Sequence, residues 1–133
     1  MKTCYIMRGL PGSGKSTIAR KIASGLHGRI HSTDDLRMVE GEYIFDPKDT
    51  ECLHRLNYDN FRDSIDLGID PVICDNTNIR HWEFERYINY AEEMGYQVAI
   101  ITVDAYPAVC CTRNTHGVPA EIIYRMAKNW EPI

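Results

Sequence analysis

Residues 9–17 have the composition and spacing of a phosphate-binding loop. Gly9 is followed after four residues by Gly14, Lys15 and Ser16. Glycines here let backbone N–H groups face a phosphate, because they lack a Cβ and can take positive φ. In this pattern the lysine reaches the β- and γ-phosphates, and the serine hydroxyl ligates Mg²⁺. We therefore expect a nucleoside triphosphate such as ATP, with Mg²⁺ on Ser16, to bind at Gly9, Pro11, Gly12, Ser13, Gly14, Lys15, Ser16 and Thr17.

Two adjacent carboxylates, Asp34 and Asp35, follow a short second apolar segment. A carboxylate near the γ-phosphate can accept the proton of an attacking hydroxyl. We expect Asp34 rather than Asp35 to be this general base, and capping of a short helix by Thr33 or Asp34 is an alternative or additional role. Arg37 lies three residues beyond Asp34, so on a helix it could clamp a substrate phosphate or simply pair with Asp34.

Two further loops carry candidate site residues. Arg113 follows the fourth apolar segment, where a lid arginine could stabilise charge on a transferring phosphoryl group, although a solvated arginine at a helix end is the alternative. Asp75 ends an apolar segment and could hold Mg²⁺ through water, as acids in this position do in other phosphate-binding-loop proteins. Asn76 and Thr77 could bind substrate, unless residues 76–78 form an Asx turn and a helix N-cap.

The elements that must position these residues alternate along the chain. Apolar or β-branched runs at 3–7, 29–32, 71–74 and 96–103 predict strands. Helical spacing predicts a first helix after the glycine loop, with Leu26 on the helix's apolar side, and further helices at 47–67, 84–94, 107–113 and 119–130. We expect 41–47 to be loop and both tryptophans to lie in the core. This order predicts an α/β fold with three layers: a short parallel sheet of four or five strands, covered by helices on both faces. Segments 9–16, 32–37, 75–78 and 104–118 would then meet at the carboxyl ends of the strands, where ligands bind.

Composition limits the class of protein. We expect residues 1–133 to form a single domain with a lid near 107–118, in a cytoplasmic protein without a signal peptide or membrane contact. The five cysteines show no zinc-ligand spacing, so we expect reduced and mostly buried thiols. The net charge of −4 argues against tight, sequence-independent duplex binding, but not against a local basic groove.

Taken in order, these residues resemble a known family. Five motifs have the same order as in the kinase domain of phage-type polynucleotide 5′-kinases. They are Gly-x-Pro-Gly-Ser-Gly-Lys-Ser-Thr at 9–17, Asp34-Asp35-x-Arg37, Asn76-Thr77-Asn78, Arg113-Asn114 and Val118-Pro119. The chain is equally similar to the polynucleotide kinase-like, AAA-type P-loop domains grouped with it, including kinase-like domains of larger eukaryotic proteins. The resemblance implies Asp34 as general base, Arg37 on the substrate phosphate beside the acceptor hydroxyl, and Arg113 on the donor phosphates.

The resemblance implies a phosphotransferase acting in nucleic acid repair, on a single-stranded or end-exposed nucleic acid with a 5′-hydroxyl. The family often has aspartate where Asn76 stands, so the roles of Asp75 and Asn76 stay open. The main alternative is a small-molecule kinase with a nucleoside or sugar acid as acceptor. An ATP-gated binding module without turnover is a third, which the presence of Lys15, Ser16, Asp34 and Arg113 disfavours.

Overall fold

The central sheet has four parallel strands, as the alternating pattern predicts. The computed structural model describes residues 1–25 and 27–133, so the expected place of Leu26 lies outside the described residues. The strands are β1 (Thr3–Arg8), β2 (Arg29–His31), β5 (Val72–Asp75) and β6 (Gln97–Thr102), in the order β2-β5-β1-β6. The α/β prediction is therefore confirmed with the smaller number of strands.

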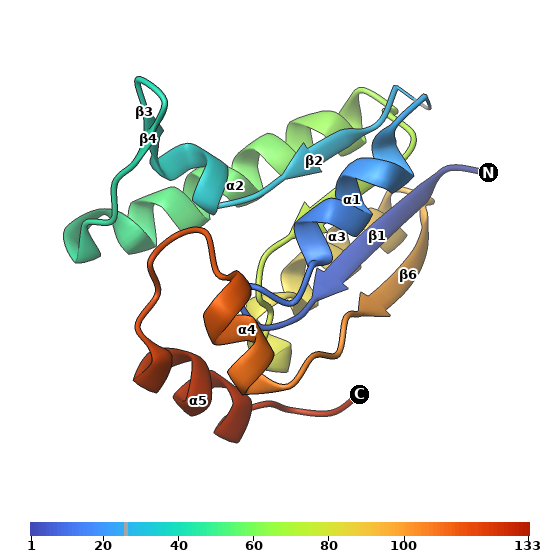
Figure 1. Ribbon diagram of the computed structural model, residues 1–133. Helices are drawn as coiled ribbons and strands as arrows, with labels where there is room; N and C mark the ends of the chain where they lie inside the picture. The colour runs from blue at the N-terminus through green and yellow to red at the C-terminus, as the bar shows by residue number, and fades with distance from the viewer. Residues whose placement is uncertain (26) are drawn as a thin grey trace.

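Helices cover both faces of this sheet (Figure 1). Alternate residues of β1 point to opposite faces, as they must in a strand. Cys4 and Ile6 pack with Phe61 and Tyr87 of α2 (Thr50–Asp66) and α3 (Glu85–Glu93). Met7 packs instead with Ala19 of α1 (Lys15–Ala23) on the other face. The three layers follow from this alternation in a strand that is buried on both sides.

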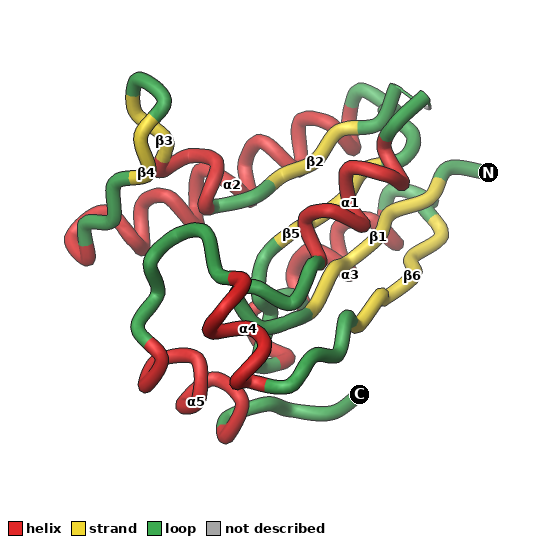
Figure 2. The backbone as a smooth tube through the Cα atoms, in the orientation of Figure 1, coloured by secondary structure: helices red, strands yellow, loops and turns green. Residues whose placement is uncertain are grey.

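A separate apolar cluster lies beyond the carboxyl ends of the strands. Helices α4 (Pro107–Arg113) and α5 (Ala120–Lys128) contribute Cys110 and Ile123, which pack with Leu10 and Ile79. Figure 2 shows the loop between these helices turning back toward the end of β2. This arrangement places residues 113–118 over the glycine loop.

Several local predictions need correction. Residues 38–43 form a small antiparallel hairpin of β3 (Met38–Val39) and β4 (Glu42–Tyr43), although the segment from 41 was expected to be loop. Residues 34–37 form a 3₁₀ helix, η1 (Asp34–Arg37), whose N-cap Thr33 makes no capping bond through its side chain. The long polar helix begins as a 3₁₀ turn, η2 (Pro47–Asp49), before α2. Trp82, expected in the core, is 71% exposed in η3 (His81–Glu83), whereas Trp130 packs with the α4–α5 cluster.

The helix N-cap at Thr77 or Asn78, which the sequence left open as an alternative, does not form. Asn78 takes a left-handed conformation with φ 49°, and its side-chain amide donates to the carbonyl oxygen of Met7 at 2.7 Å. The next helical turn, η3, is capped by Arg80 instead. The segment after β5 is thus tied to β1, beside the glycine loop.

Cysteine placement agrees with the expected thiols. Cys4, Cys74 and Cys110 are buried, and all five cysteines are free. Burial raises the pKa of the Cys4 thiol to about 12, so it remains protonated. Among the described residues, no helix is both long and apolar enough to cross a lipid bilayer.

Candidate functional site

A cavity of about 720 Å³ lies at the carboxyl ends of the strands. Its wall combines residues from all four loops that the sequence singled out. The glycine loop and the start of α1 form one side, the segment 32–35 and Asp75 form another, and residues 113–116 close the third. Its volume is within the range of small-molecule ligand sites.

The glycine loop has the backbone shape that phosphate binding requires. Gly12 and Gly14 have φ of 83° and 100°, and Gly14 is the N-cap of α1. A Cβ on Gly12 would clash with the carbonyl oxygen of Cys110, so the loop packs tightly against α4. Lys15 is buried on the cavity wall as the first residue of α1, where unpaired backbone N–H groups and the helix dipole favour an anion.

Pro11, Ser16 and Thr17 also line the cavity, whereas two of the expected phosphate-binding residues lie behind its wall. Ser13 is buried, and its Oγ has no hydrogen-bond partner. A Cβ on Gly9 would lie 2.6 Å from that Oγ and 3.0 Å from the carbonyl oxygen of Val103. Gly9 therefore provides close packing beneath the loop, and its N–H donates to the carbonyl oxygen of Thr77 at 3.1 Å.

Ser16 and Asp75 place two oxygen atoms side by side that fit a magnesium ion as ligands. The Ser16 hydroxyl donates to Asp75 Oδ2 at 2.7 Å. Asp75 is 4% exposed, and its Oδ1 is buried without a hydrogen-bond partner. A buried carboxylate with an unused oxygen beside a hydroxyl suits a hard cation, which prefers oxygen ligands. Among the described residues no three His, Cys, Asp or Glu side chains cluster as a metal site by themselves.

Asp34 is held at the cavity by two aromatic side chains that the sequence did not indicate. The Tyr43 hydroxyl donates to Asp34 Oδ1 at 3.0 Å, and His116 Nε2 lies 4.0 Å from Asp34 Oδ2. The two rings stack on each other with centroids 4.1 Å apart. Burial, and then the charge and hydrogen bond of Asp34, raise the pKa of Tyr43 to about 12, so its hydroxyl keeps its proton.

Asp35 also lines the cavity but in a more negative environment. Desolvation of its carboxyl by the surrounding protein raises its pKa, and the charges of Asp75 and Asp34 raise it further. Arg20 and His116 act in the opposite direction. Three carboxylates thus face one cavity, and a bound cation would relieve their mutual repulsion.

Arg37 lies behind Asp34 and is almost fully buried. Its Nε is 3.9 Å from Asp34 Oδ1, and its Nη2 donates to Thr50 Oγ1 at 3.2 Å. The Phe45 ring stacks on the guanidinium, 4.7 Å from the central carbon. Among the described residues Nη1 is buried without a hydrogen-bond partner, and Arg37 itself does not line the cavity. A buried guanidinium with an unused N–H is equipped to bind an anion.

Arg113 is exposed at the end of α4 and lines the cavity. The turn that follows is organised by Asn114, whose amide nitrogen donates to the carbonyl oxygen of Val118 at 2.7 Å. Its amide oxygen accepts from the N–H groups of His116 and Val118 at 3.1 and 3.2 Å. This turn brings His116 to Asp34.

The remaining expected substrate residues lie outside this cavity. Asn76 and Thr77 line a neighbouring groove, and Asn76 Oδ1 accepts from the Thr33 N–H at 3.0 Å. Sequence reasoning missed Arg20, Tyr43 and His116. Arg20 could have been found, because it follows Ser16 by one helical turn and so shares its face. Nothing in the sequence pairs Tyr43 with His116.

Comparison with known proteins shows the family of the chain. A family model described as an AAA domain matches residues 5–125. The human (Homo sapiens) NEDD4-binding protein 2 is 36% identical over 141 residues, which cover 98% of this chain but 8% of that protein. The chain therefore spans a small part of this relative's length.

Solved structures show the same fold. A chain of the Pnkp1/Rnl/Hen1 RNA repair complex aligns with a TM-score of 0.77 and 21% identity, over 96% of this chain and 43% of that one. A gluconokinase from Sinorhizobium meliloti 1021 aligns with a TM-score of 0.67 and 15% identity, over 98% of this chain and 75% of that one. The fold is that of P-loop kinases, and the chain belongs to the AAA domain family, as the sequence resemblance predicts.

Proposed function

We propose that the chain transfers the γ-phosphate of ATP to the 5′-hydroxyl of a polynucleotide, RNA or DNA. One cavity is lined by the glycine loop, Lys15, Asp34 and Arg113. The residues proposed to bind the ATP phosphates, to act as general base and to stabilise the transferring group are therefore close together. This set meets the needs of phosphoryl transfer, which depends on positioning and charge stabilisation.

In the proposed reaction, Asp34 accepts the proton of the acceptor hydroxyl while the oxygen of that hydroxyl bonds to the γ-phosphorus. The bond between that phosphorus and the bridging oxygen breaks, and the electron pair leaves with ADP. Lys15 and Arg113 offset the negative charge that spreads over the transferring group. A carboxylate accepts several hydrogen bonds, so the acceptor hydroxyl can donate to Asp34 while the Tyr43 hydroxyl stays at Oδ1.

We further propose that Mg²⁺ is the required ion and that Ser16 and Asp75 hold it, Asp75 through water. Bound there, the ion would neutralise charge on the donor phosphates. The free thiols fit a reducing compartment such as the cytoplasm.

The single observation that carries the acceptor proposal is the buried Arg37 beside Asp34, whose Nη1 has no hydrogen-bond partner among the described residues. In a 5′-hydroxyl oligonucleotide, the 3′-phosphate of the first nucleotide is the anion nearest to the reacting hydroxyl. The relative in an RNA repair complex supports the same acceptor class and a role in nucleic acid repair. A sugar acid also carries an anion, and the likeness to a gluconokinase supports this second candidate.

The test compares kcat/KM on a nucleoside 3′-phosphate and on the bare nucleoside. One charge-assisted phosphate contact is worth about 1.5–3 kcal/mol, so the wild type should prefer the phosphorylated acceptor roughly ten- to a hundredfold. Arg37→Ala should remove this preference and leave the KM for ATP unchanged. Arg125→Ala, at an exposed position on α5, is the matched control.

Equal use of the two acceptors by the wild type would contradict the polynucleotide proposal. Transfer to sugar acids in place of nucleotides would then favour the small-molecule kinase. ATP binding without transfer to any acceptor would favour the non-catalytic binding module.

A further inference from the structure

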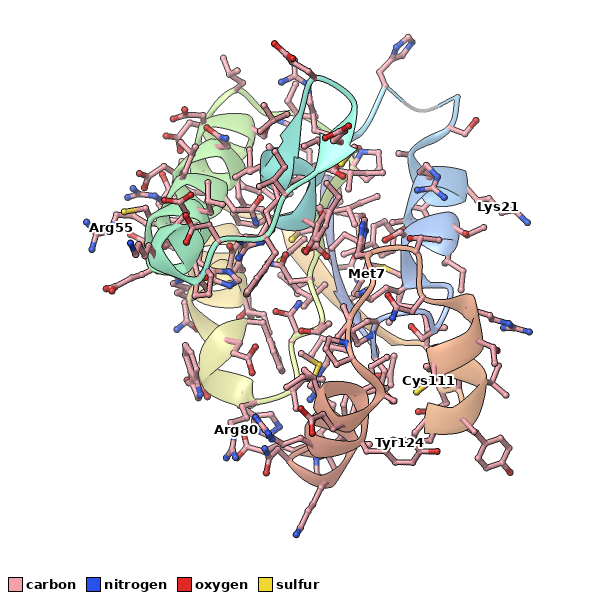
Figure 3. All side chains as sticks on the ribbon, turned by 60° about the vertical axis from the view of Figure 1, so that its left-hand side comes forward. Met7, Lys21, Arg55, Arg80, Cys111 and Tyr124 are labelled. Atoms are coloured by element: carbon pink, nitrogen blue, oxygen red, sulfur yellow. The ribbon has the colours of Figure 1, made fainter. Side chains whose placement is uncertain are left out.

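A second groove of about 560 Å³ opens beside the candidate site, between the start of α2, the segment 76–78 and the start of α3. We call it the α2–α3 groove. The side chains that matter for its chemistry are Thr50, His54, Arg55, Asn76, Trp82 and Arg86. Figure 3 shows Arg55 on α2, on the opposite side of the molecule from Lys21 on α1.

The α2–α3 groove is joined to the acceptor side of the candidate site by hydrogen bonds. Thr33, next to Asp34, donates its backbone N–H to Asn76 Oδ1 at 3.0 Å, and its hydroxyl lies 3.1 Å from His54 Nδ1. Arg37 donates to Thr50 Oγ1 in the groove wall. Arg37 therefore connects Asp34 to the wall of the groove.

Trp82 gives the groove an unusual wall. Its indole is 71% exposed, although burying so large an aromatic side chain would normally be favourable. The backbone around it is fixed: the Arg80 N–H donates to Glu83 Oε2 and the His81 N–H donates to Glu131 Oε1, both at 2.8 Å. An exposed aromatic ring on a fixed backbone is suited to stacking against a nucleobase.

Two arginines give the groove its candidate phosphate contacts. In the part of the chain that the structure describes, neither Arg55 nor Arg86 has a carboxylate within 4.0 Å. The Arg86 guanidinium lies over the Tyr58 ring at 4.5 Å, which orients it. Glu51 and Glu83 also line the groove, and the Arg80 N–H donates to Glu83. The two arginines are therefore local cations rather than a net positive field.

We propose that the α2–α3 groove binds the single strand on the 3′ side of the reacting nucleotide. Trp82 stacks on a base, and Arg55 and Arg86 contact backbone phosphates. This inference rests on the proposed polynucleotide kinase function and extends it, because it assigns the groove that would make longer acceptors better than a mononucleotide.

The first experiment measures kcat/KM for a nucleoside 3′-phosphate and for 5′-hydroxyl oligonucleotides of two, four and six residues, as RNA and as DNA. The wild type should use the longer acceptors better. In Trp82→Ala the ratio of tetranucleotide to mononucleotide kcat/KM should fall about 5- to 150-fold, the usual effect of losing one stacked base. Trp82→Phe should restore most of the ratio, and Tyr124→Ala, an exposed aromatic on α5, should not change it.

The second experiment is independent of turnover. It measures binding of a tetranucleotide through tryptophan fluorescence, at several salt concentrations. The wild type should show quenching that is lost in Trp82→Phe. Arg55→Gln should reduce the slope of log Kd against log salt by about 0.7, the share of one phosphate contact, whereas Arg125→Gln should not.

The outcomes separate this inference from the function on which it rests. Transfer to 5′-hydroxyl acceptors with no length dependence, or with a ratio unaffected by Trp82→Ala, overturns the groove assignment and leaves the kinase intact. Quenching that depends on Trp82, without transfer to any acceptor, supports the groove and rejects the kinase.

Discussion

Asp34 and Asp35 are neighbours in the chain but have different surroundings. Asp34 accepts a hydrogen bond from Tyr43 and has Arg37 behind it, at distances of 3.0 and 3.9 Å. Desolvation, and then the charges of Asp75 and Asp34, raise the pKa of Asp35. Adjacent carboxylates can thus be assigned different roles from their partners.

Asp34→Asn should therefore lose most of the turnover and keep the affinity for ATP. A general base typically contributes about 10² to 10⁴ in rate, and the amide cannot accept the proton. Steady-state kinetics with ATP and a 5′-hydroxyl oligonucleotide measure both quantities. Asp35→Asn is the matched control and should reduce kcat much less. A larger loss in Asp35→Asn would place the base one residue later.

At the scale of elements, the glycine loop and α4 act as one unit. The tight packing of Gly12 against the Cys110 carbonyl oxygen fixes where α4 ends, and Asn114 fixes the turn after it. Arg113, between these two anchors, faces the cavity. That residues 107–118 act as a lid remains a prediction. The contact of α4 with the glycine loop is observed in the structure.

If Arg113 acts on the transferring group, Arg113→Ala should lower kcat far more than it raises the KM for the acceptor. The reason is that the charge Arg113 meets is largest in the transition state. Separate titrations of ATP and of oligonucleotide distinguish the two effects, and Arg125→Ala on α5 serves as control. An effect confined to the acceptor KM would assign Arg113 to substrate binding.

The sequence predicts those parts of the site that depend on local residue patterns, and misses contacts between segments far apart in the chain. The glycine spacing is local, and parallel strands bring their carboxyl ends to one edge, so Lys15, Asp34, Asp75 and Arg113 could be expected in one cavity. The hairpin at 38–43 has strands of two residues each, too short to show alternation. Its Tyr43 stacks on His116, which lies 73 positions later in the chain, a contact that no periodicity encodes.

At the scale of the whole molecule, one buried cation connects the sheet to the chain's last residues. Arg8 ends β1 and is 0% exposed, although an arginine at this position gave no such indication in the sequence. Its Nε donates to the carbonyl oxygen of Asn78 at 2.8 Å, and its Nη2 donates to those of Ile79 and Glu131 at 2.9 and 2.7 Å. The rings of Phe84 and Trp130 lie 4.7 and 4.2 Å from the guanidinium carbon.

Replacing a complete buried ion pair by apolar residues is often harmless, but here the partners are backbone carbonyls that no substitution can remove. Arg8→Met would remove the Arg8 bonds to the carbonyl oxygens of Asn78 and Glu131, whereas the Ile79 carbonyl oxygen would keep its bond from the Glu131 N–H. An acceptor left without a partner costs about 1–3 kcal/mol, so we expect the free energy of unfolding in urea to fall by at least about 2 kcal/mol. Arg8→Lys, which keeps a charged donor, should lose less, and Arg29→Met, at an exposed position of β2, should change stability by about 0.5 kcal/mol or less. If Arg8→Met were as stable as the wild type, the segment 78–79 and the residues after α5 would be held by packing rather than by this cation.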